Sequence, residues 1–121
     1  MIRREQVHDL LVAASPSFDP NLSLDDNLYE LLGEFGRHLL ELYKLDQARS
    51  FGEVGALIER LHVEGDDFVE NAATIGLLES LQNSWLIAEV DPMPFREWLL
   101  PVSRERWDAL NEFWHGDTES H

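Results

Sequence analysis

The residues best suited to acid–base or metal chemistry lie close together in the middle of the chain. They are a histidine and three carboxylates within six residues: His62, Glu64, Asp66 and Asp67. Imidazole nitrogens and carboxylate oxygens bind divalent metals, and together with Glu70 they could line the acidic pocket of an enzyme. Gly65 interrupts this run where a helix is expected to end, so the side chains need not converge. Because acidic side chains interact favourably with the first turn of a helix, we assign Asp66 and Asp67 to helix capping and predict no metal site.

The rest of the sequence offers little catalytic equipment. The chain contains no cysteine, which excludes disulfides, thiolate nucleophiles and metal sites built from thiolates. It contains no Gly-x-Ser-x-Gly elbow, phosphate-binding loop, His-Glu-x-x-His motif, dinucleotide fingerprint or calcium loop. His8 and His38 stand singly on predicted helices, and the His115–His121 tail has the composition of a solvent-facing chain end. We therefore predict no cofactor.

The strongest signal in the sequence is its charge. Among 121 residues, 24 Asp and Glu outnumber nine Lys and Arg, which gives a formal net charge of −15. Such a surface repels nucleic-acid phosphates and anionic lipids, so it argues against both as partners and favours cationic ones. Between His62 and Phe95 there are seven acidic residues and no lysine or arginine. This third of the chain therefore has a net charge of −7.

Two interpretations of the acidic segment remain open. It can be a solvated face beside an aromatic core, or a protein-binding surface in which carboxylates attract a basic partner and aromatic residues anchor it. Because loops lie at the surface, we expect the tryptophans of the proline-containing stretch over 84–102 to be partly exposed. The predicted partner-binding residues are Glu64, Asp66, Asp67, Glu70, Trp85, Glu89, Asp91 and Trp98.

Four helices follow from the spacing of apolar residues: 2–14, 27–45, 50–63 and 67–83. Pro16 ends the first helix, and a loop over 15–26 is expected to contact the core through Phe18, Leu22 and Leu24. The 67–83 segment is apolar on all sides in its middle, which is typical of a helix buried on most of its surface. We expect it to be the centre of the fold.

Capping residues and prolines predict where the helices begin and end. Ser50 with Glu53 forms a capping-box pattern, and Asp67 with Glu70 repeats it with a carboxylate. Three prolines rule out a continuous helix over 84–102, leaving room for a helical turn at 95–99 and a short strand at 85–90. Ser103 is expected to cap a final helix whose apolar face contains Trp107, Leu110, Phe113 and Trp114.

These elements predict one all-α domain over residues 1–115, followed by a frayed tail over 116–121. The fold class is a single-domain bundle of about five helices, and a short two-layer stack of the HEAT or armadillo kind remains open. A monomer is favoured over a homodimer.

The C-terminal half resembles a known kind of protein. The residues that carry the likeness are Ala73 to Asn83, Asp91-Pro92 with Phe95, and Leu100-Pro101 with Ser103 leading into Trp107, Leu110, Phe113 and Trp114. This pattern, over about residues 60–115, is similar to a family of small acidic bacterial proteins of uncharacterised domain type. In general character the chain also resembles immunity proteins of bacterial toxin systems, and that likeness implies a basic toxin domain as partner.

Residues and resemblance together favour a non-catalytic protein-binding module, most concretely an immunity-like inhibitor of a basic bacterial toxin. Two alternatives stay open: a small enzyme with an acidic or metal-bearing pocket between His62 and Glu70, and a homo-oligomeric scaffold whose spare aromatic residues form the interface. The N-terminus lacks the apolar stretch of an export signal, and no run of residues is long enough to span a membrane. We therefore expect a cytoplasmic protein.

Overall fold

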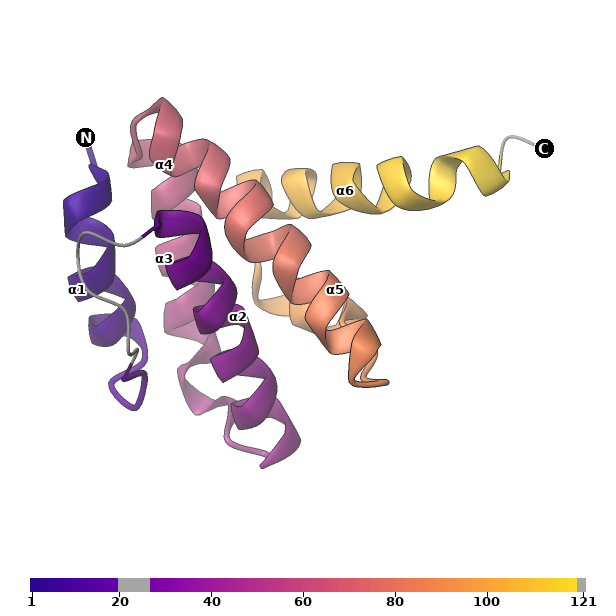
Figure 1. Ribbon diagram of the computed structural model, residues 1–121, viewed down its shortest axis with the longest axis horizontal. Helices are drawn as coiled ribbons and strands as arrows, with labels where there is room; N and C mark the ends of the chain where they lie inside the picture. Colours follow the sequence, from indigo (N-terminus) through magenta and orange to yellow (C-terminus); the bar gives the residue numbers. More distant parts are fainter. Residues whose placement is uncertain (20–26, 120–121) are drawn as a thin grey trace.

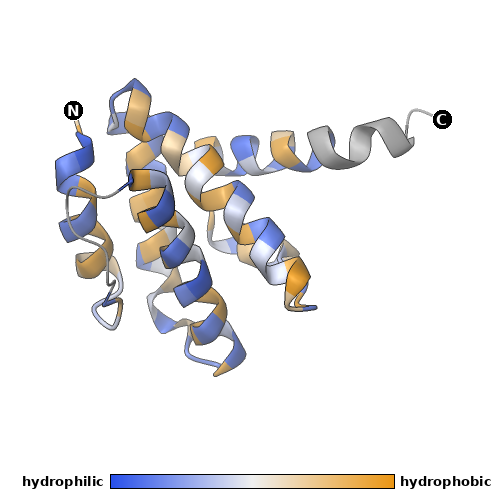
Figure 2. Cartoon of the chain, viewed as in Figure 1, coloured by the Kyte–Doolittle hydropathy of each residue, from blue (hydrophilic) through white to orange (hydrophobic). Residues whose placement is uncertain are grey.

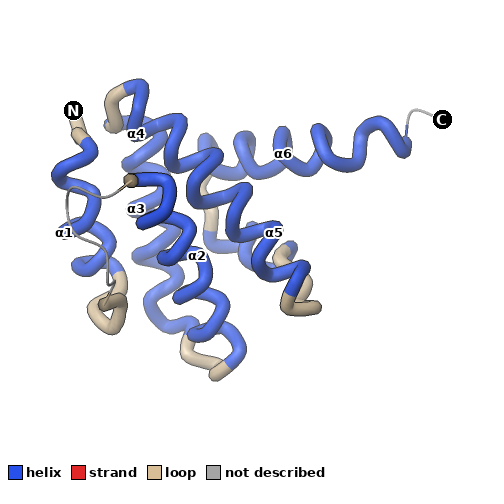
Figure 3. The backbone as a smooth tube through the Cα atoms, viewed as in Figure 1, coloured by secondary structure: helices blue, strands red, loops and turns tan. Residues whose placement is uncertain are grey.

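Helices account for nearly all of the structure. The computed structural model describes residues 1–19 and 27–119, with residues 113–119 described for their backbone alone (Figure 3). The elements, in chain order, are α1 (Arg4–Ala14), α2 (Leu28–Lys44), the 3₁₀ turn η1 (Ala48–Ser50), α3 (Phe51–Glu64), α4 (Asp67–Asn71), the π-helical η2 (Ala72–Glu79), α5 (Ser80–Ile87), the 3₁₀ turn η3 (Met93–Trp98) and α6 (Pro101–Glu119). Among the described residues, the extended structure is limited to one bridge between Ile2 and Gly65. The predicted all-α fold is confirmed.

The segments α4, η2 and α5 form one continuous helical rod that organises the bundle (Figure 1). On one side, α2 packs along η2 and α5, while α3 packs against α4 and α1 packs against α3. The last helix, α6, contacts both α3 and η2, crosses the rod and points away from α1, α2 and α3 (Figure 1). No helix in the described part of the chain is long and apolar enough to cross a membrane.

The rod corresponds to the predicted 67–83 helix but extends further along the chain. It continues to Ile87, so the helix includes the first residues of the 85–90 stretch, where a short strand is the alternative. Its middle is buried on most of its surface, as expected: Ala73, Leu77 and Leu78 are fully buried, and Ile75 is exposed. This burial follows because η2 contacts α2, α3 and α6.

An aromatic cluster fills the centre of the core. Phe95 of η3 lies with its ring centroid 5.5 Å from that of Phe51, 5.8 Å from that of Trp85 and 6.0 Å from that of Trp107. Such pairs each add about 0.5–1.5 kcal/mol beyond the burial of their surface. The short η3 turn thus joins α3, α5 and α6, and this explains why the proline-containing stretch is ordered.

Two glycines allow helices to approach unusually closely. A Cβ atom added to Gly55 of α3 would lie 1.9 Å from the carbonyl oxygen of Trp98, so η3 rests directly on the α3 backbone. A Cβ atom added to Gly76 of η2 would lie 3.2 Å from the Cα atom of Tyr29 in α2. A side chain at Gly76 would therefore require Tyr29 to shift by a few tenths of an ångström.

Several predicted helix ends are placed differently by the structure. Ser50 makes no capping hydrogen bond with its side chain, because η1 leads directly into α3. The cap of α4 is Asp66 instead of Asp67, since its Oδ1 accepts from the backbone N–H of Val69 at 2.8 Å. α6 begins at Pro101, so Ser103 is not its cap. The backbone of α6 continues to Glu119, past the predicted end of the domain at residue 115.

The structure describes the first residues of the predicted 15–26 loop, up to residue 19. Phe18 is buried against Phe35, as expected, with the ring centroids 4.9 Å apart. Leu22 and Leu24 lie outside the described residues, as does part of the predicted 116–121 tail.

Candidate functional site

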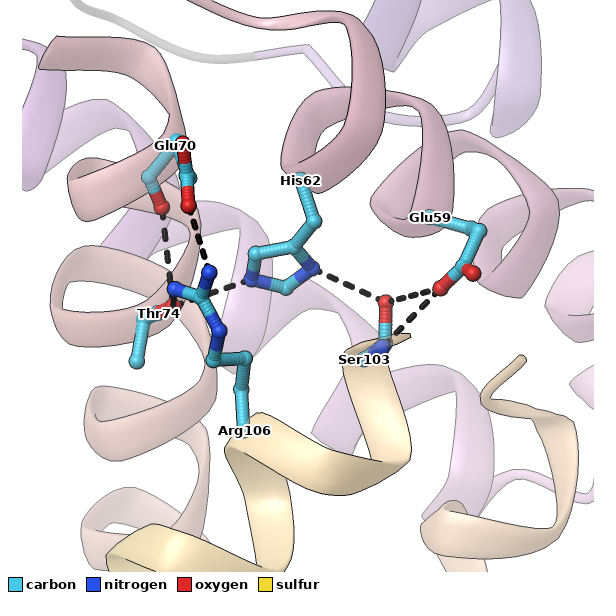
Figure 4. Close-up of polar contacts among 6 residues, drawn as sticks. All are labelled: Glu59, His62, Glu70, Thr74, Ser103 and Arg106. Carbon is cyan, nitrogen blue, oxygen red and sulfur yellow. Dashed lines mark hydrogen bonds and ion pairs between the residues drawn. The ribbon is translucent and has the colours of Figure 1, made fainter. Parts of the chain in front are cut away.

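Polar side chains from three elements meet at a buried histidine. α3 contributes a glutamate and the histidine, the rod contributes a glutamate and a threonine, and α6 contributes a serine and an arginine (Figure 4). We call this group the His62 cluster; its members are Glu59, His62, Glu70, Thr74, Ser103 and Arg106.

Glu59 fixes the beginning of α6. Its Oε1 accepts from the backbone N–H and the hydroxyl of Ser103, both at 2.9 Å, and its Oε2 accepts from the N–H of Val102 at 3.1 Å. The first N–H groups of a helix lack intrahelical partners, so a carboxylate from another helix can satisfy them. Burial raises the pKa of Glu59, but these hydrogen bonds outweigh it and hold the pKa below its ordinary value. Glu59 is therefore ionised at neutral pH.

The ionised carboxylate determines the direction of the neighbouring hydrogen bonds. A carboxylate can only accept, so the Ser103 hydroxyl donates to Glu59, and its oxygen accepts from His62 Nδ1–H at 2.9 Å. The other ring nitrogen, Nε2, then accepts from the Thr74 hydroxyl at 3.0 Å. Burial and the nearby Arg106 guanidinium lower the pKa of His62 to about 4, so the imidazole is neutral at pH 7.

Arg106 completes the cluster on the side of the rod. Its guanidinium forms an ion pair with Glu70 and donates to Thr74 Oγ1 at 3.4 Å. The cluster is thus a chain of hydrogen bonds that begins at a cation, Arg106, and ends at an anion, Glu59. It connects α6 to α3 and to the rod.

The residue types of the cluster are those of a hydrolase triad, but their connections are different. In a triad the carboxylate orients the histidine, and the histidine accepts the proton of the serine. Here the carboxylate holds Ser103, and His62 donates to the serine oxygen. Ser103 also has no exposed surface, so no substrate can reach its hydroxyl. The arrangement is that of a structural clamp.

The four residues considered as metal ligands lie in different environments and do not share a common partner. His62 belongs to the clamp, Glu64 pairs with Arg60 at 3.1 Å, and Asp66 caps α4. Asp67 is exposed to solvent. Among the described residues, no three His, Asp or Glu side chains are grouped so that they could hold a metal ion.

Several of the predicted partner-binding carboxylates form ion pairs or hydrogen bonds within the protein. Glu64 pairs with Arg60, one turn earlier in α3, and Glu70 pairs with Arg106 of α6. Both arginines lie outside the segment without basic residues. Asp66 and Asp91 are occupied by short-range hydrogen bonds, Asp66 from Val69 N–H and Asp91 from Met93 N–H. Asp67 and Glu89 are exposed at the two ends of the rod. Four of the six predicted carboxylates thus have partners within the protein, and the other two, Asp67 and Glu89, lie at opposite ends of the rod.

The two predicted tryptophan anchors lie in or against the core. Trp85 is fully buried: its Nε1 donates to the Gly36 carbonyl at 3.4 Å, and its ring packs on Tyr43 and Phe95. The expectation that Trp85 is partly exposed is wrong, because it lies on the inner face of α5 instead of in a loop. Trp98 is half-buried, with its ring centroid 5.0 Å from that of Phe51.

The apolar side chains exposed at the ends of α5 and α2 are aliphatic. At the end of α5, Leu86 is 56% exposed and Ile87 is 84% exposed, and at the end of α2, Leu45 is 62% exposed. The last turns of the two helices are in contact, since the rings of Tyr43 and Trp85 are 4.9 Å apart. We call the surface at these two helix ends the end face; its residues are Leu45, Asp46, Leu86, Ile87 and Glu89.

A pattern in the sequence could have located this surface. Consecutive helical residues point about 100° apart, so once Trp85 faces the core, Leu86 and Ile87 must face away from it. Figure 2 shows the apolar colouring at the end of α5.

The chain also matches a known family. Residues 8–115 match the model of a family described as Domain of unknown function (DUF7674). The protein belongs to the DUF7674 family. The match runs from α1 into α6, so the DUF7674 domain includes the N-terminal helices as well as the region over 60–115. Searches of curated proteins and of solved structures found no match. The family description names no activity, and the case for a function rests on the residues of this DUF7674 domain.

Proposed function

We propose that this DUF7674 domain is a non-catalytic module that binds a basic protein partner. The observation that carries the proposal is the excess of acidic side chains: nine lysines and arginines cannot neutralise 24 carboxylates. A net charge of −15 produces a field that attracts cationic proteins and raises their association rates by roughly 10- to 1,000-fold at low salt.

The surface of the rod supports this proposal. From Asp67 to Glu89 the chain has no basic residue, and its exposed positions carry carboxylates and uncharged side chains. A partner lying along the rod would therefore meet no cation from this element. Arg106 of α6 compensates only the beginning of the rod, through its ion pair with Glu70.

The closed His62 cluster favours a binding module over the enzyme alternative. A catalytic centre needs a nucleophile or base that substrate can reach. In this protein the serine and the histidine of the cluster are buried and already hydrogen-bonded to other side chains. Their role in holding α6 explains the residue types without invoking a reaction.

Within this proposal, an immunity-like inhibitor of a bacterial toxin is the most specific role. A toxin that cuts or modifies nucleic acid needs a basic surface, and an acidic protein competes with phosphates for that surface. Such an inhibitor would act in the cytoplasm, where it protects the cell's own nucleic acid.

The proposal is tested by isolating and titrating the partner. The full chain is immobilised, proteins bound from an extract of its own cells at about 50 mM NaCl are identified by mass spectrometry, and the captured protein is purified for calorimetric titration. We expect a basic protein that binds with one-to-one stoichiometry and a Kd that rises about tenfold or more by 300 mM NaCl. An acidic partner, or a Kd independent of salt, would overturn the proposal. If co-expression does not relieve toxicity of the partner, the immunity role fails and the binding role stands.

A further inference from the structure

The backbone conformation and the charges of the end face are unfavourable for the stability of the folded protein. α2 and α5 each finish in the same kind of turn, with an acidic residue in the left-handed backbone conformation: Asp46 at φ 58° and Glu89 at φ 63°. In both turns the hydrogen bonds are those of a Schellman motif, in which Gln47 N–H donates to Leu42 and Val90 N–H donates to Trp85. Glycine is the usual residue at this position because it has no Cβ atom.

The charges at these two positions are also unfavourable. The C-terminal end of a helix carries partial negative charge, so cations are the stabilising side chains there. Asp46 and Glu89 place carboxylates beside two such ends, and α5 has no basic residue in its last turn. In α2, Lys44 lies in the last turn and pairs with Glu41 at 3.7 Å. The end of α5 therefore presents negative potential without a cation in its own last turn, whereas Lys44 offsets part of that potential at the end of α2.

Apolar side chains surround these carboxylates. Leu45, Leu86 and Ile87 are all more than half exposed, and Ile87 lines a hollow of about 570 Å³ between α2 and α5. The segment after α1 also borders that hollow, and its charged lining consists of three carboxylates and one guanidinium: Asp19, Glu34, Glu41 and Arg37. Single exposed aliphatic residues are common on protein surfaces, but a group of them beside a hollow is typical of an interaction site.

From these observations we infer that the end face is the docking site for the basic partner, whose lysine or arginine side chains meet Asp46 and Glu89 while its apolar side chains cover Leu45, Leu86 and Ile87. This inference rests on the proposed function and names the surface and the chemistry of the partner. A second copy of the chain is the less favoured occupant, because two faces of the same negative charge would meet in a symmetric contact.

Glycine substitutions test the inference, because they are expected to affect binding and stability in opposite directions. Asp46→Gly and Glu89→Gly remove the carboxylates and place the preferred residue in the left-handed conformation. We expect the double variant to have a higher Tm than the wild type and to bind more weakly. The probe is a synthetic helical peptide with one lysine face and one leucine face, titrated by fluorescence anisotropy at about 50 mM NaCl. The expected loss of affinity is about tenfold.

Matched variants report on the apolar part of the surface. Ile87→Ser should weaken peptide binding about tenfold, whereas Val63→Ser, which changes an apolar residue of comparable exposure at the end of α3, should change it less than about twofold. Glu53→Gln is the corresponding control for charge. If the controls weaken binding as much as the end-face variants, the docking site is wrong and the general electrostatic proposal stands.

Two further outcomes would overturn the inference. If the peptide binds with an affinity independent of salt, or does not bind, both the docking site and the proposed function fail. If sedimentation of the wild type shows a dimer that Ile87→Ser dissociates, a second copy covers the end face and the inference about a basic partner is wrong.

Discussion

His62 has only one arrangement of protons that satisfies its neighbours. Glu59 accepts the proton of Ser103, which makes Nδ1 of the imidazole a donor and Nε2 an acceptor. Adding a proton to Nε2 would remove the acceptor for Thr74 and place a cation near Arg106, with only Glu59 and Glu70 to compensate. The histidine is therefore held in its neutral form.

This arrangement predicts a loss of stability in mild acid. The pKa of His62 is about 4 in the folded protein against 6.5 for a free imidazole, so the unfolded chain binds the additional proton. The free energy of unfolding should then fall as pH decreases from 6.5 to 4, with a contribution of about 3 kcal/mol from this residue. Urea denaturation at several pH values measures it.

The contribution of His62 is isolated by comparing one variant with the wild type. His62→Gln should show a weaker dependence of the unfolding free energy on pH between 6.5 and 4 than the wild type. Equal slopes for His62→Gln and the wild type would show that the imidazole is not held neutral.

The hydrogen bonds of Glu59 predict a second effect of a single residue on stability. Glu59→Ala leaves the N–H groups of Val102 and Ser103 and the Ser103 hydroxyl without their acceptor, which should lower the unfolding free energy by about 2 kcal/mol. Glu53→Ala, on the exposed side of the same helix, should change it by less than about 0.5 kcal/mol. Denaturation curves of equal midpoint for the two variants would refute the clamp.

At the scale of helices, periodicity predicted most of the structure. The segments expected at 27–45 and 50–63 are found at Leu28–Lys44 and Phe51–Glu64, because each has a continuous apolar stripe that the core buries. The ends were less predictable. The donors at the start of α6 are satisfied by Glu59, from a helix far earlier in the chain, and no local pattern around Ser103 indicates this. The ends of α2 and α5 lack the glycine that usually marks them.

The contact between η3 and α3 gives a prediction at this scale. Gly55→Ala places a methyl group against the Trp98 carbonyl oxygen and should reduce the unfolding free energy by about 2 kcal/mol or more, since backbone must move. Gly52→Ala, three residues earlier in α3, meets no atom within 4 Å and should stabilise the protein by roughly 0.5–1 kcal/mol. Thermal melts of the two variants test this; a Gly55→Ala variant as stable as Gly52→Ala would contradict the packing.

For the whole molecule, the sequence predicted the charge but not its distribution. The count of acidic residues is independent of folding, whereas the pairing of Glu70 with Arg106, 36 residues later, depends on where α6 is placed. The same limit applies to the tryptophans, because exposure of Trp85 depends on which face of α5 meets α2. Of the predicted site, Glu89 alone lies on the end face; Asp46 and the exposed aliphatic residues were found from the structure.

The central claim is that the protein captures a basic partner through long-range electrostatic attraction. It is tested most directly by the association rate constant with the captured partner, measured by stopped-flow mixing from about 20 to 500 mM NaCl. We predict that the association rate constant decreases about tenfold or more over this range while the dissociation rate constant changes much less. An association rate constant that does not depend on salt would contradict the claim.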